Sequence, residues 1–395
     1  MSTPRWAGPA AGAVLALLSA LYVHLAVVRP GGPDGMSDLH VYVGSAQTLL
    51  AGGSLYDFVS FNGDRFVYPP FAGLAFAPLL VVGEPALRVL WTLAQCAEVV
   101  LLAAVVVARG NHPLLRRAGA GVTVPVVACL LLLSQPVFTG LFLGQVSLLV
   151  VVLVLLDALE VTPARLRGVP TGLAAAVKLT PLAFVPYLWF TGRRRAAVVA
   201  TLTFATATAL AALVLPEQSR WFWSHGLGPA GFIDLAQADN QSLRGVAARL
   251  GWSGDGGGLL LATSALVLLL AYRRSGDLHQ QGQWLAGSVV VGAAVVLVSP
   301  ISWSHHQTPL VLAAACAVGG SGRRALAWAA GIVLLTSFPV QLALPSIGPP
   351  LDLLTSNTGA LLAMLLLCWA PFGPGTGSAQ AGRVTEWRAG SRYSG

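Results

Sequence analysis

Long apolar segments recur along the chain, separated by short polar turns. One helical crossing of a bilayer takes about 20 apolar residues. Segments that approach this length are 10–28, 86–108, 119–139, 145–159, 196–215, 257–272, 284–299, 308–320, 325–342 and 356–371. This pattern predicts an all-α, polytopic membrane protein with about 10–12 membrane helices. The integral membrane domain is expected to cover residues 1–371.

One apolar segment, residues 169–190, is interrupted in a way that a simple span is not. It lies between two arginine clusters, and Lys178, Pro181 and Pro186 break its pattern. Non-helical backbone at membrane depth is tolerated only where it faces protein or water. We therefore expect a re-entrant or broken helical hairpin that enters and leaves on one side, with Lys178 near its tip.

Three other segments need separate assignments. Residues 68–82 are apolar but flanked by proline and too short to cross comfortably, so we expect a half-inserted or interfacial helix. The first apolar run lacks a small-residue cleavage pattern and is expected to stay attached as a membrane helix. Residues 372–395 are rich in Gly, Ser and Arg and are expected to form a disordered cytoplasmic tail.

Composition supports the membrane assignment and excludes several classes of protein. Of the 395 residues, 55% are hydrophobic and 10% are charged, whereas about a quarter of a soluble domain is charged. So few charges cannot cover a water-facing surface, which excludes a cytosolic enzyme and a disordered chain. A nucleic-acid binder is excluded as well, despite the net charge of +8. The chain has no P-loop and no dinucleotide fingerprint, so a cytosolic nucleotide donor is not expected.

Arginine clusters set the orientation of the predicted spans, because cytoplasmic loops are enriched in Lys and Arg. Clusters at 109–117, 165–167, 193–195, 273–274 and 323–324 and in the tail place these turns, and the N-terminus, inside. The opposite loops, 29–70, 216–256, 299–308 and 343–355, carry nine of the fifteen acidic residues. An active site built from these loops is expected to face the extracytoplasmic side of the cell membrane.

Lys178, the only lysine, is the most conspicuous charged residue within an apolar segment. Ionisable residues at membrane depth are costly and tend to be functional. One interpretation is a lysine whose flexible stem lets the ammonium reach the interface. The other is an ammonium held for a phosphate, assisted by helix ends and free backbone N–H groups.

Asp38 follows the first predicted span and precedes an apolar-periodic stretch that ends near Leu50. Ser37 or Asp38 ahead of such a stretch is typical of a helix N-cap. A carboxylate at the membrane surface can also act as a general base. Both interpretations hold together if Ser37 provides the cap.

The last outer loop, 299–308, contains Trp303, His305 and His306. These are either interfacial polar and aromatic side chains or hydrogen-bond donors to a phosphate or sugar. Adjacent histidines point to different faces of a helix, and no Cys, Asp or Glu cluster accompanies them, so we predict no metal site. Arg244, in the large loop before it, offers a planar fork suited to phosphate. Gln145, in a glycine-bracketed turn, is a candidate ligand for a sugar hydroxyl.

Six short motifs occur in order over roughly residues 37–310. They are Asp38-Leu-His-Val-Tyr42, Tyr68-Pro-Pro-Phe71, Gly144-Gln145, Val177-Lys-Leu-Thr-Pro181, Asn240-Gln-Ser-Leu-Arg-Gly245 and Ser299-Pro-Ile-Ser-Trp-Ser-His-His306. Together they resemble glycosyltransferase family 87, the polyprenyl-phosphate-mannose-dependent α-(1→2)-mannosyltransferases of mycobacteria and related actinobacteria. The resemblance implies a GT-C glycosyltransferase fold. It also implies inverting transfer of mannose from polyprenyl-phosphate-β-mannose to a membrane glycolipid, such as a phosphatidylinositol mannoside or lipomannan, at the extracytoplasmic face.

The resemblance also implies roles for single residues. The catalytic base falls on Asp38, and the donor-phosphate contacts fall on Lys178, Arg244, His305 and His306. The residues expected to contact the sugar or the acceptor are His40, Tyr42, Tyr68, Gln145, Asn240, Gln241 and Trp303. No cofactor and no metal are expected; the lipid-linked sugar is the co-substrate. The sequence departs from the family pattern at Gln307-Thr-Pro309, which follows the two histidines where the family has apolar aromatic residues. This departure concerns the residues expected to contact the acceptor.

Two alternatives remain open at this point. A polyprenyl-phosphate-arabinose-dependent arabinofuranosyltransferase has the same fold and the same kind of donor. A lipid-linked-sugar flippase would be non-enzymatic. A transporter usually shows paired repeats with broken helices in both halves, and this chain has one clear broken segment.

Overall fold

The structure is a computed structural model that describes residues 6–28, 35–116, 119–226, 234–252, 257–337 and 348–373, together with Pro4. Over these residues the ordered elements are helices, and extended pairing is limited to two isolated bridges, Val59 with Arg65 and Val318 with Phe372. The predicted all-α class is therefore confirmed. The expected disordered tail lies outside the described residues, apart from Phe372 and Gly373.

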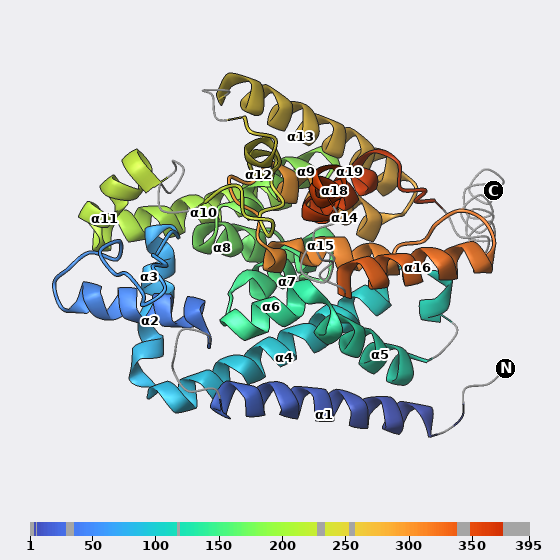
Figure 1. The fold of residues 1–395 in the computed structure, drawn as a ribbon, viewed down its shortest axis with the longest axis horizontal. Helices are drawn as coiled ribbons and strands as arrows, with labels where there is room; N and C mark the ends of the chain where they lie inside the picture. Colours follow the sequence, from blue (N-terminus) through green and yellow to red (C-terminus); the bar gives the residue numbers. More distant parts are fainter. Residues whose placement is uncertain are drawn as a thin grey trace, which may run out of the picture.

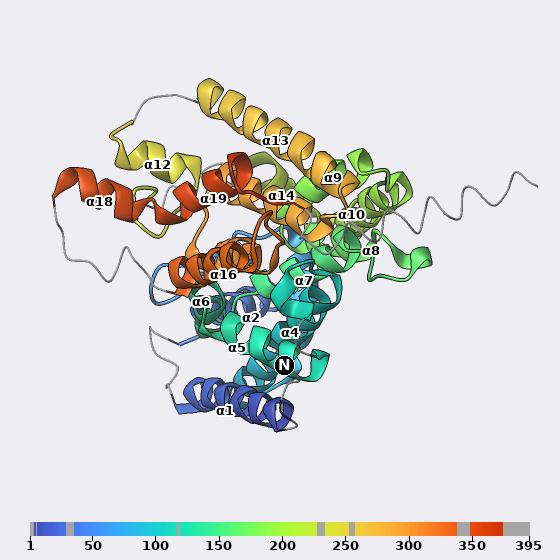
Figure 2. The same cartoon turned by 90° about the vertical axis from the view of Figure 1, so that its right-hand side faces the viewer.

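Four helices are long and apolar enough to cross a membrane. They are α1 (Ala7–Val28), α4 (Glu84–Arg109), α10 (Arg194–Val214) and α13 (Gly257–Gln280). Each coincides with a predicted span, and many of their large apolar side chains are exposed, as expected of helices that face lipid. Figures 1 and 2 show α1 and α13 on opposite edges of the molecule, with α7 (Ser147–Ala158) and α14 (Trp284–Val298) between them.

The predicted span 119–139 is a bent pair rather than one helix. Helices α5 (Ala120–Leu133) and α6 (Gln135–Leu143) meet at an angle of 70°. Ser134 between them has extended backbone, and Pro136 lies in the first turn of α6. Proline is favoured in a first turn because no intrahelical partner is lost there. Counting this pair as one span gives up to five among the described residues, fewer than the 10–12 expected.

The other predicted spans form shorter or divided helices. Segment 68–82 forms α3 (Pro70–Phe76) and the 3-10 turn η1 (Ala77–Val81), as expected of a short helix. Segment 308–320 is divided into α15 (Thr308–Val311) and η7 (Leu312–Ala315). The last two predicted spans form α16 (Gly322–Ser337) and α19 (Thr358–Cys368). Hydropathy found these helices, but their length does not qualify them as single crossings. A further helix, α18 (Pro349–Ser356), lies in the predicted outer loop 343–355 and was not predicted.

The interrupted segment forms the predicted broken hairpin. Helix α8 (Val169–Val177) ends at Lys178, whose backbone is extended, and the chain continues through η4 (Thr180–Ala183) into α9 (Phe184–Phe190). Gly168, just before α8, lies against the backbone of Ala196 near the start of α10. The hairpin therefore begins and ends at the same end of α10, with Lys178 away from both ends.

Helix α14 forms the centre of the core. Twelve of its fifteen residues are buried, and α13, α19 and α7 pack against it. A second cluster of buried side chains gathers around α2 (Ser37–Leu50) and α3, and includes Leu39, Tyr42, Phe76 and Phe222. This second cluster fixes α2 beside the core at one end of the molecule (Figure 1).

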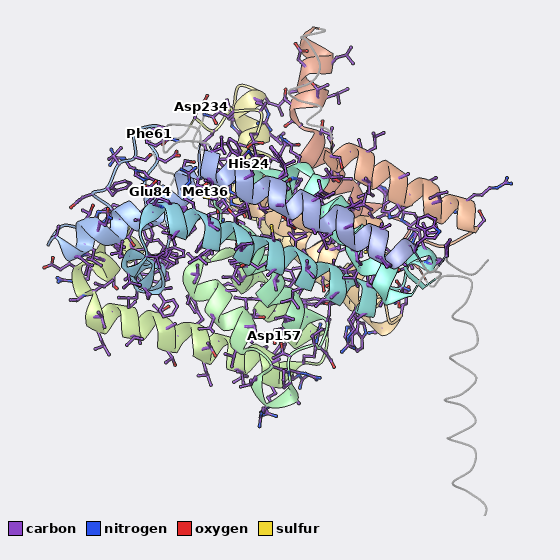
Figure 3. The ribbon with its side chains drawn as sticks, turned by 90° about the horizontal axis from the view of Figure 1, so that it is seen from below. His24, Met36, Phe61, Glu84, Asp157 and Asp234 are labelled. Atoms are coloured by element: carbon purple, nitrogen blue, oxygen red, sulfur yellow. The ribbon has the colours of Figure 1, made fainter. Side chains whose placement is uncertain are left out.

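Basic turns gather at the opposite end from α2. Arg109 donates to the backbone oxygen of Glu160 at 3.1 Å, and Arg193 donates to the backbone of Ala158, which ends α7. Asp157 accepts from the backbone N–H and the hydroxyl of Thr171 at 3.0 and 2.8 Å. Figure 3 shows Met36, Phe61 and Glu84 toward one end of the molecule and Asp157 in a different region.

Candidate active site

The outer loops converge on one large cavity of about 1260 Å³. Eight of the twelve predicted site residues line it: Asp38, Tyr68, Gln145, Lys178, Arg244, Trp303, His305 and His306. They come from α2, the loop before α3, the α6–α7 turn, the hairpin tip, α12 (Leu243–Arg249) and the loop after α14. Segments that lie more than 250 residues apart in the sequence therefore face one space.

Asp38 is the second residue of α2 and lines the cavity. The N-cap position is occupied by Met36, which makes no side-chain cap hydrogen bond. Neither Ser37 nor Asp38 is the cap, so the Asp38 carboxylate is not used for that purpose. Its half-buried position at the wall of the cavity instead leaves it facing the cationic residues.

Gly144 determines how closely α2 approaches the α6–α7 turn. Its φ of +69° lies in the left-handed region, and a Cβ there would lie 2.8 Å from the Cβ of Leu39. Only glycine adopts this backbone without strain and without that contact. The carbonyl of Gly144 accepts from the indole of Trp91 at 2.9 Å. The glycine therefore places Gln145 directly behind Asp38.

Gln145 is held by three hydroxyl groups. Its Oε1 accepts from Tyr42 at 3.2 Å, from Tyr68 at 3.3 Å and from Ser147 at 3.1 Å. Three hydroxyl donors around one atom identify that atom as the amide oxygen of Gln145. The amide nitrogen therefore lies on the other side of the group, where it can donate. The Gln145 side chain hydrogen-bonds Asp38. Gln145 thus orients the carboxylate from behind.

Lys178 places its ammonium at the centre of the cavity wall. Its Nζ donates to the hydroxyl of Ser147 at 2.9 Å, lies 2.6 Å from His306 Nε2, and lies 5.6 Å from the ring centroid of Tyr68. Among the described residues no acidic side chain forms a salt bridge with Lys178. The side chain points into the protein rather than to an interface. A cation held in this way, by neutral partners, is available to an incoming anion.

The two histidines differ in their partners. His306 accepts from the backbone N–H of Trp303 at 3.1 Å through Nδ1, and its Nε2 faces Lys178. His305 is 3% exposed, and neither of its ring nitrogens has a hydrogen-bond partner among the described residues. The Ser302 hydroxyl is buried and lacks a partner in the same way. Buried polar atoms are nearly always paired, so these atoms indicate the position of a ligand.

Arg244 completes the cationic side of the cavity. It lies in the first turn of α12, where the Ser242 hydroxyl caps the helix by accepting from Gly245 N–H at 3.1 Å. Its guanidinium forms no hydrogen bond within the part of the chain that the structure describes. The cavity therefore faces Asp38 on one side with Lys178, Arg244 and the two histidines on the other.

Four predicted site residues lie outside the lining of this cavity. His40 is exposed and packs its ring against Phe58 and Phe61. Tyr42 is fully buried behind Gln145.

The amide pair of the large outer loop holds backbone rather than facing the cavity. Asn240 accepts from the N–H of Ser302 at 3.0 Å, and Gln241 accepts from the N–H of Ala360 at 2.9 Å. Both are fully buried. These two residues fix the loop that carries Ser302, His305 and His306.

Some cavity residues were not singled out from the sequence. Asp64 and Arg65 line the cavity beside Tyr68, and Phe222 closes another part of the wall. Asp239 accepts from the backbone N–H and the hydroxyl of Ser304, both at 3.3 Å, and so supports the loop that carries His305 and His306. Asp64 belongs to one of the acid-rich outer loops, and this position in the sequence could have identified it as a candidate site residue. Ser302 offered none, because a single serine in a loop is common.

Burial sets the ionisation of the central groups. It raises the pKa of Asp38 from 3.8 to about 7, with the negative charge of Asp64 adding to the rise, while the hydrogen bond from Gln145 and the charge of Lys178 oppose it. Burial lowers the pKa of Lys178 to about 8, and the nearby Asp38 opposes that change. Burial also lowers the pKa of both histidines, and so does the Lys178 charge. A carboxylate with a pKa near neutrality is suited to general base catalysis.

Metal-ligating side chains do not cluster anywhere in the described part of the chain, where no three His, Cys, Asp or Glu residues come together as a metal site. Metal independence remains a prediction.

Comparison with known proteins agrees with the motifs. The model of glycosyltransferase family 87 matches residues 66–300. The chain is 33% identical over 293 residues, 71% of this chain and 69% of the relative, to a polyprenol-phosphate-mannose-dependent alpha-(1-2)-phosphatidylinositol pentamannoside mannosyltransferase of Mycolicibacterium smegmatis. It is 31% identical over 359 residues, 85% of this chain and 80% of the relative, to the protein of that name from Mycobacterium tuberculosis. No solved structure matches the chain.

The helices are those of a multi-pass membrane protein, and its large cavity is lined by the Asp38 carboxylate together with Lys178 and Arg244. This chain belongs to glycosyltransferase family 87 and is a glycosyltransferase. The resemblance found in its motifs is thereby confirmed.

Proposed function

We propose that this protein transfers mannose from polyprenyl-phosphate-β-mannose to the 2-hydroxyl of a mannoside in a phosphatidylinositol mannoside or related glycolipid, with inversion to an α-(1→2) linkage. The names of the relatives support the donor and the linkage. The single observation that carries the proposal is the shared cavity, in which Asp38 faces Lys178, Arg244, His305 and His306.

In the proposed reaction Asp38 removes the proton of the acceptor hydroxyl as its oxygen attacks C1 of the donor mannose. The C1–O bond to the phosphate breaks, and the phosphate leaves with the electron pair. Lys178 and Arg244 neutralise the charge that develops on the leaving phosphate, which is where electrostatic stabilisation contributes most. The proton stays on Asp38 until it passes to solvent. A single displacement of this kind needs one base and inverts the anomeric centre, as in the inverting reactions of sugars.

The extracytoplasmic face is part of the proposal. Helix α7 runs from Ser147, beside Lys178, to Ala158, beside Arg193. Its twelve residues separate the two ends by about 16 Å. The basic turns lie at the Arg193 end, and basic turns are enriched in the cytoplasm. This supports a cavity that opens to the other side.

Donor profiling tests the proposal. Purified protein in nanodiscs is given polyprenyl-phosphate-mannose or polyprenyl-phosphate-arabinose with a phosphatidylinositol mannoside, and the product is analysed for sugar, linkage and anomeric configuration. We expect an α-(1→2)-mannosylated product from the mannose donor. Transfer of arabinose in preference would establish the alternative transferase. Movement of lipid-linked sugar across the membrane with no product would establish a flippase.

A further inference from the structure

An apolar cavity adjoins the active site beneath the cationic residues. It contains about 710 Å³ of space unfilled by protein atoms and is lined by α7, α14, α9 and the hairpin tip. It shares Lys178, Thr180, His305 and His306 with the active-site cavity, so the two spaces meet at these residues. The reaction proposed above does not use this second space.

The lining of this cavity is strongly polarised along its length. Lys178, His305 and Ser302 lie at the end that meets the active site. Farther in, the walls are formed by valine and other apolar side chains, such as Val154 and Val289. No acidic or arginine side chain is part of the described lining. Ser288 is the one polar residue away from the mouth, and Tyr187 lies 3.3 Å from its hydroxyl.

The dimensions suit a chain rather than a compact group. The lining extends along α14 from Ser288 to Ser299, the residue that follows the helix, and these eleven helical steps correspond to about 16 Å. None of the lining residues is exposed on the protein surface, but Val151, Val295 and Pro309 are only half-buried. The walls are therefore not sealed, and a longer chain can continue beyond them.

The mouth carries the features of an anion position. The two ring nitrogens of His305 and the hydroxyl of Ser302 are buried without partners among the described residues, and the ammonium of Lys178 has only neutral partners. The N–H of a neutral His305 ring, the Ser302 hydroxyl and the Lys178 ammonium are hydrogen-bond donors, and an anion with several acceptor oxygens, such as a phosphate, accepts from all three. A ligand that also fills the space behind them is a phosphate attached to a hydrocarbon chain.

We propose that this apolar cavity binds the phosphate-proximal isoprene units of the donor. This inference rests on the proposed function and assigns the part of the site that recognises the lipid of the donor. Branched valine walls accommodate a methyl-branched chain through ordinary apolar burial. In this arrangement the chain holds the phosphate against Lys178 and His305 while the mannose projects into the larger cavity toward Asp38.

Val154→Phe tests the proposal because the larger ring fills the deep part of the cavity. Transfer is measured with two donors, a mannosyl phosphate that carries a single isoprene unit and the full-length polyprenyl donor. We expect kcat/KM to fall about tenfold or more for the long donor, since several apolar groups lose their burial, and to stay unchanged for the short one. The matched control is Leu153→Phe, since Leu153 is a half-buried neighbour on α7 that does not line the cavity. It should not discriminate between the donors.

Other results overturn the inference. An equal loss with both donors would show that the cavity does not select the chain. A loss that depends on the acyl chains of the acceptor would show that the acceptor occupies it. If wild-type protein transfers mannose from neither donor, the proposed function itself fails, which is a separate outcome.

A second measurement serves if Val154→Phe does not fold. A polyprenyl phosphate with a diazirine on its second isoprene unit is irradiated with the wild-type protein. We expect labelled peptides that contain Val154 or Val289. Labelling confined to the outer faces of α1 and α13 would contradict the inference.

Discussion

Asp38→Asn separates the catalytic role of Asp38 from its structural role. The substitution keeps the size of the side chain and its ability to accept from Gln145, but an amide cannot take a proton. General base catalysis contributes about 10²–10⁴ in rate, so we expect kcat to fall by that factor, or by about 3–5 kcal/mol in barrier.

Asp38→Asn should be more stable than the wild-type protein, and this difference in stability should be larger at high pH. Burial raises the pKa of Asp38 from 3.8 to about 7, so ionising it disfavours the folded state. The cost begins above the ordinary pKa and is complete above about pH 7, where it reaches at most about 4 kcal/mol. Thermal unfolding at pH 5 and at pH 8 should therefore show that Asn stabilises the protein more at pH 8.

Asp64→Asn is the matched control, because Asp64 lines the same cavity and its carboxylate accepts from Asn62 at 2.7 Å. We expect a much smaller effect on kcat. Full turnover by Asp38→Asn would refute the base assignment. A loss confined to Asp64→Asn would transfer that role to Asp64.

Three further predictions follow from the site. The profile of kcat/KM against pH should be bell-shaped. Asp38 must be ionised, which requires a pH above about 7, and Lys178 must be protonated, which fails above about pH 8. Lys178→Arg should remove the alkaline limb of the profile, and an unchanged limb would mean that another group titrates there. A chelator should leave transfer unchanged, and restoration of lost activity by added Mg²⁺ or Mn²⁺ would show a metal requirement. Gly144→Ala should lower both the melting temperature and kcat. Backbone strain alone should lower the stability by about 1–2 kcal/mol, and the contact with Leu39 should lower it further. Gly52→Ala is the control: Gly52 has a φ of +89° with open space around it, so this variant should show the strain without the loss of kcat.

The sequence was most informative where one physical signal dominates. Long apolar runs bounded by charge or proline predicted α1, α4 and α10 closely. The break at Lys178 was predicted as well, since a charge beside Thr-Pro cannot continue an apolar helix. The convergence of the acid-rich outer loops on one cavity also followed from the orientation of the spans.

Other features depend on packing between distant segments, which a single sequence does not reveal. Hydropathy did not show that α5 and α6 bend by 70°, because an apolar run has the same composition whether it is straight or bent. It could not distinguish Asn240 and Gln241, which hold backbone groups, from Arg244, which lines the cavity. The adjoining apolar cavity was also invisible, since valines that line a space and valines that fill a core are identical in sequence.

The most direct test is a structure of the protein in a lipid nanodisc with polyprenyl phosphate, the leaving group of the proposed reaction. We predict a phosphate within hydrogen-bonding distance of Lys178 and His305, with the Asp38 carboxylate across the same cavity. A phosphate bound elsewhere, or an Asp38 side chain turned away from it, would contradict this arrangement.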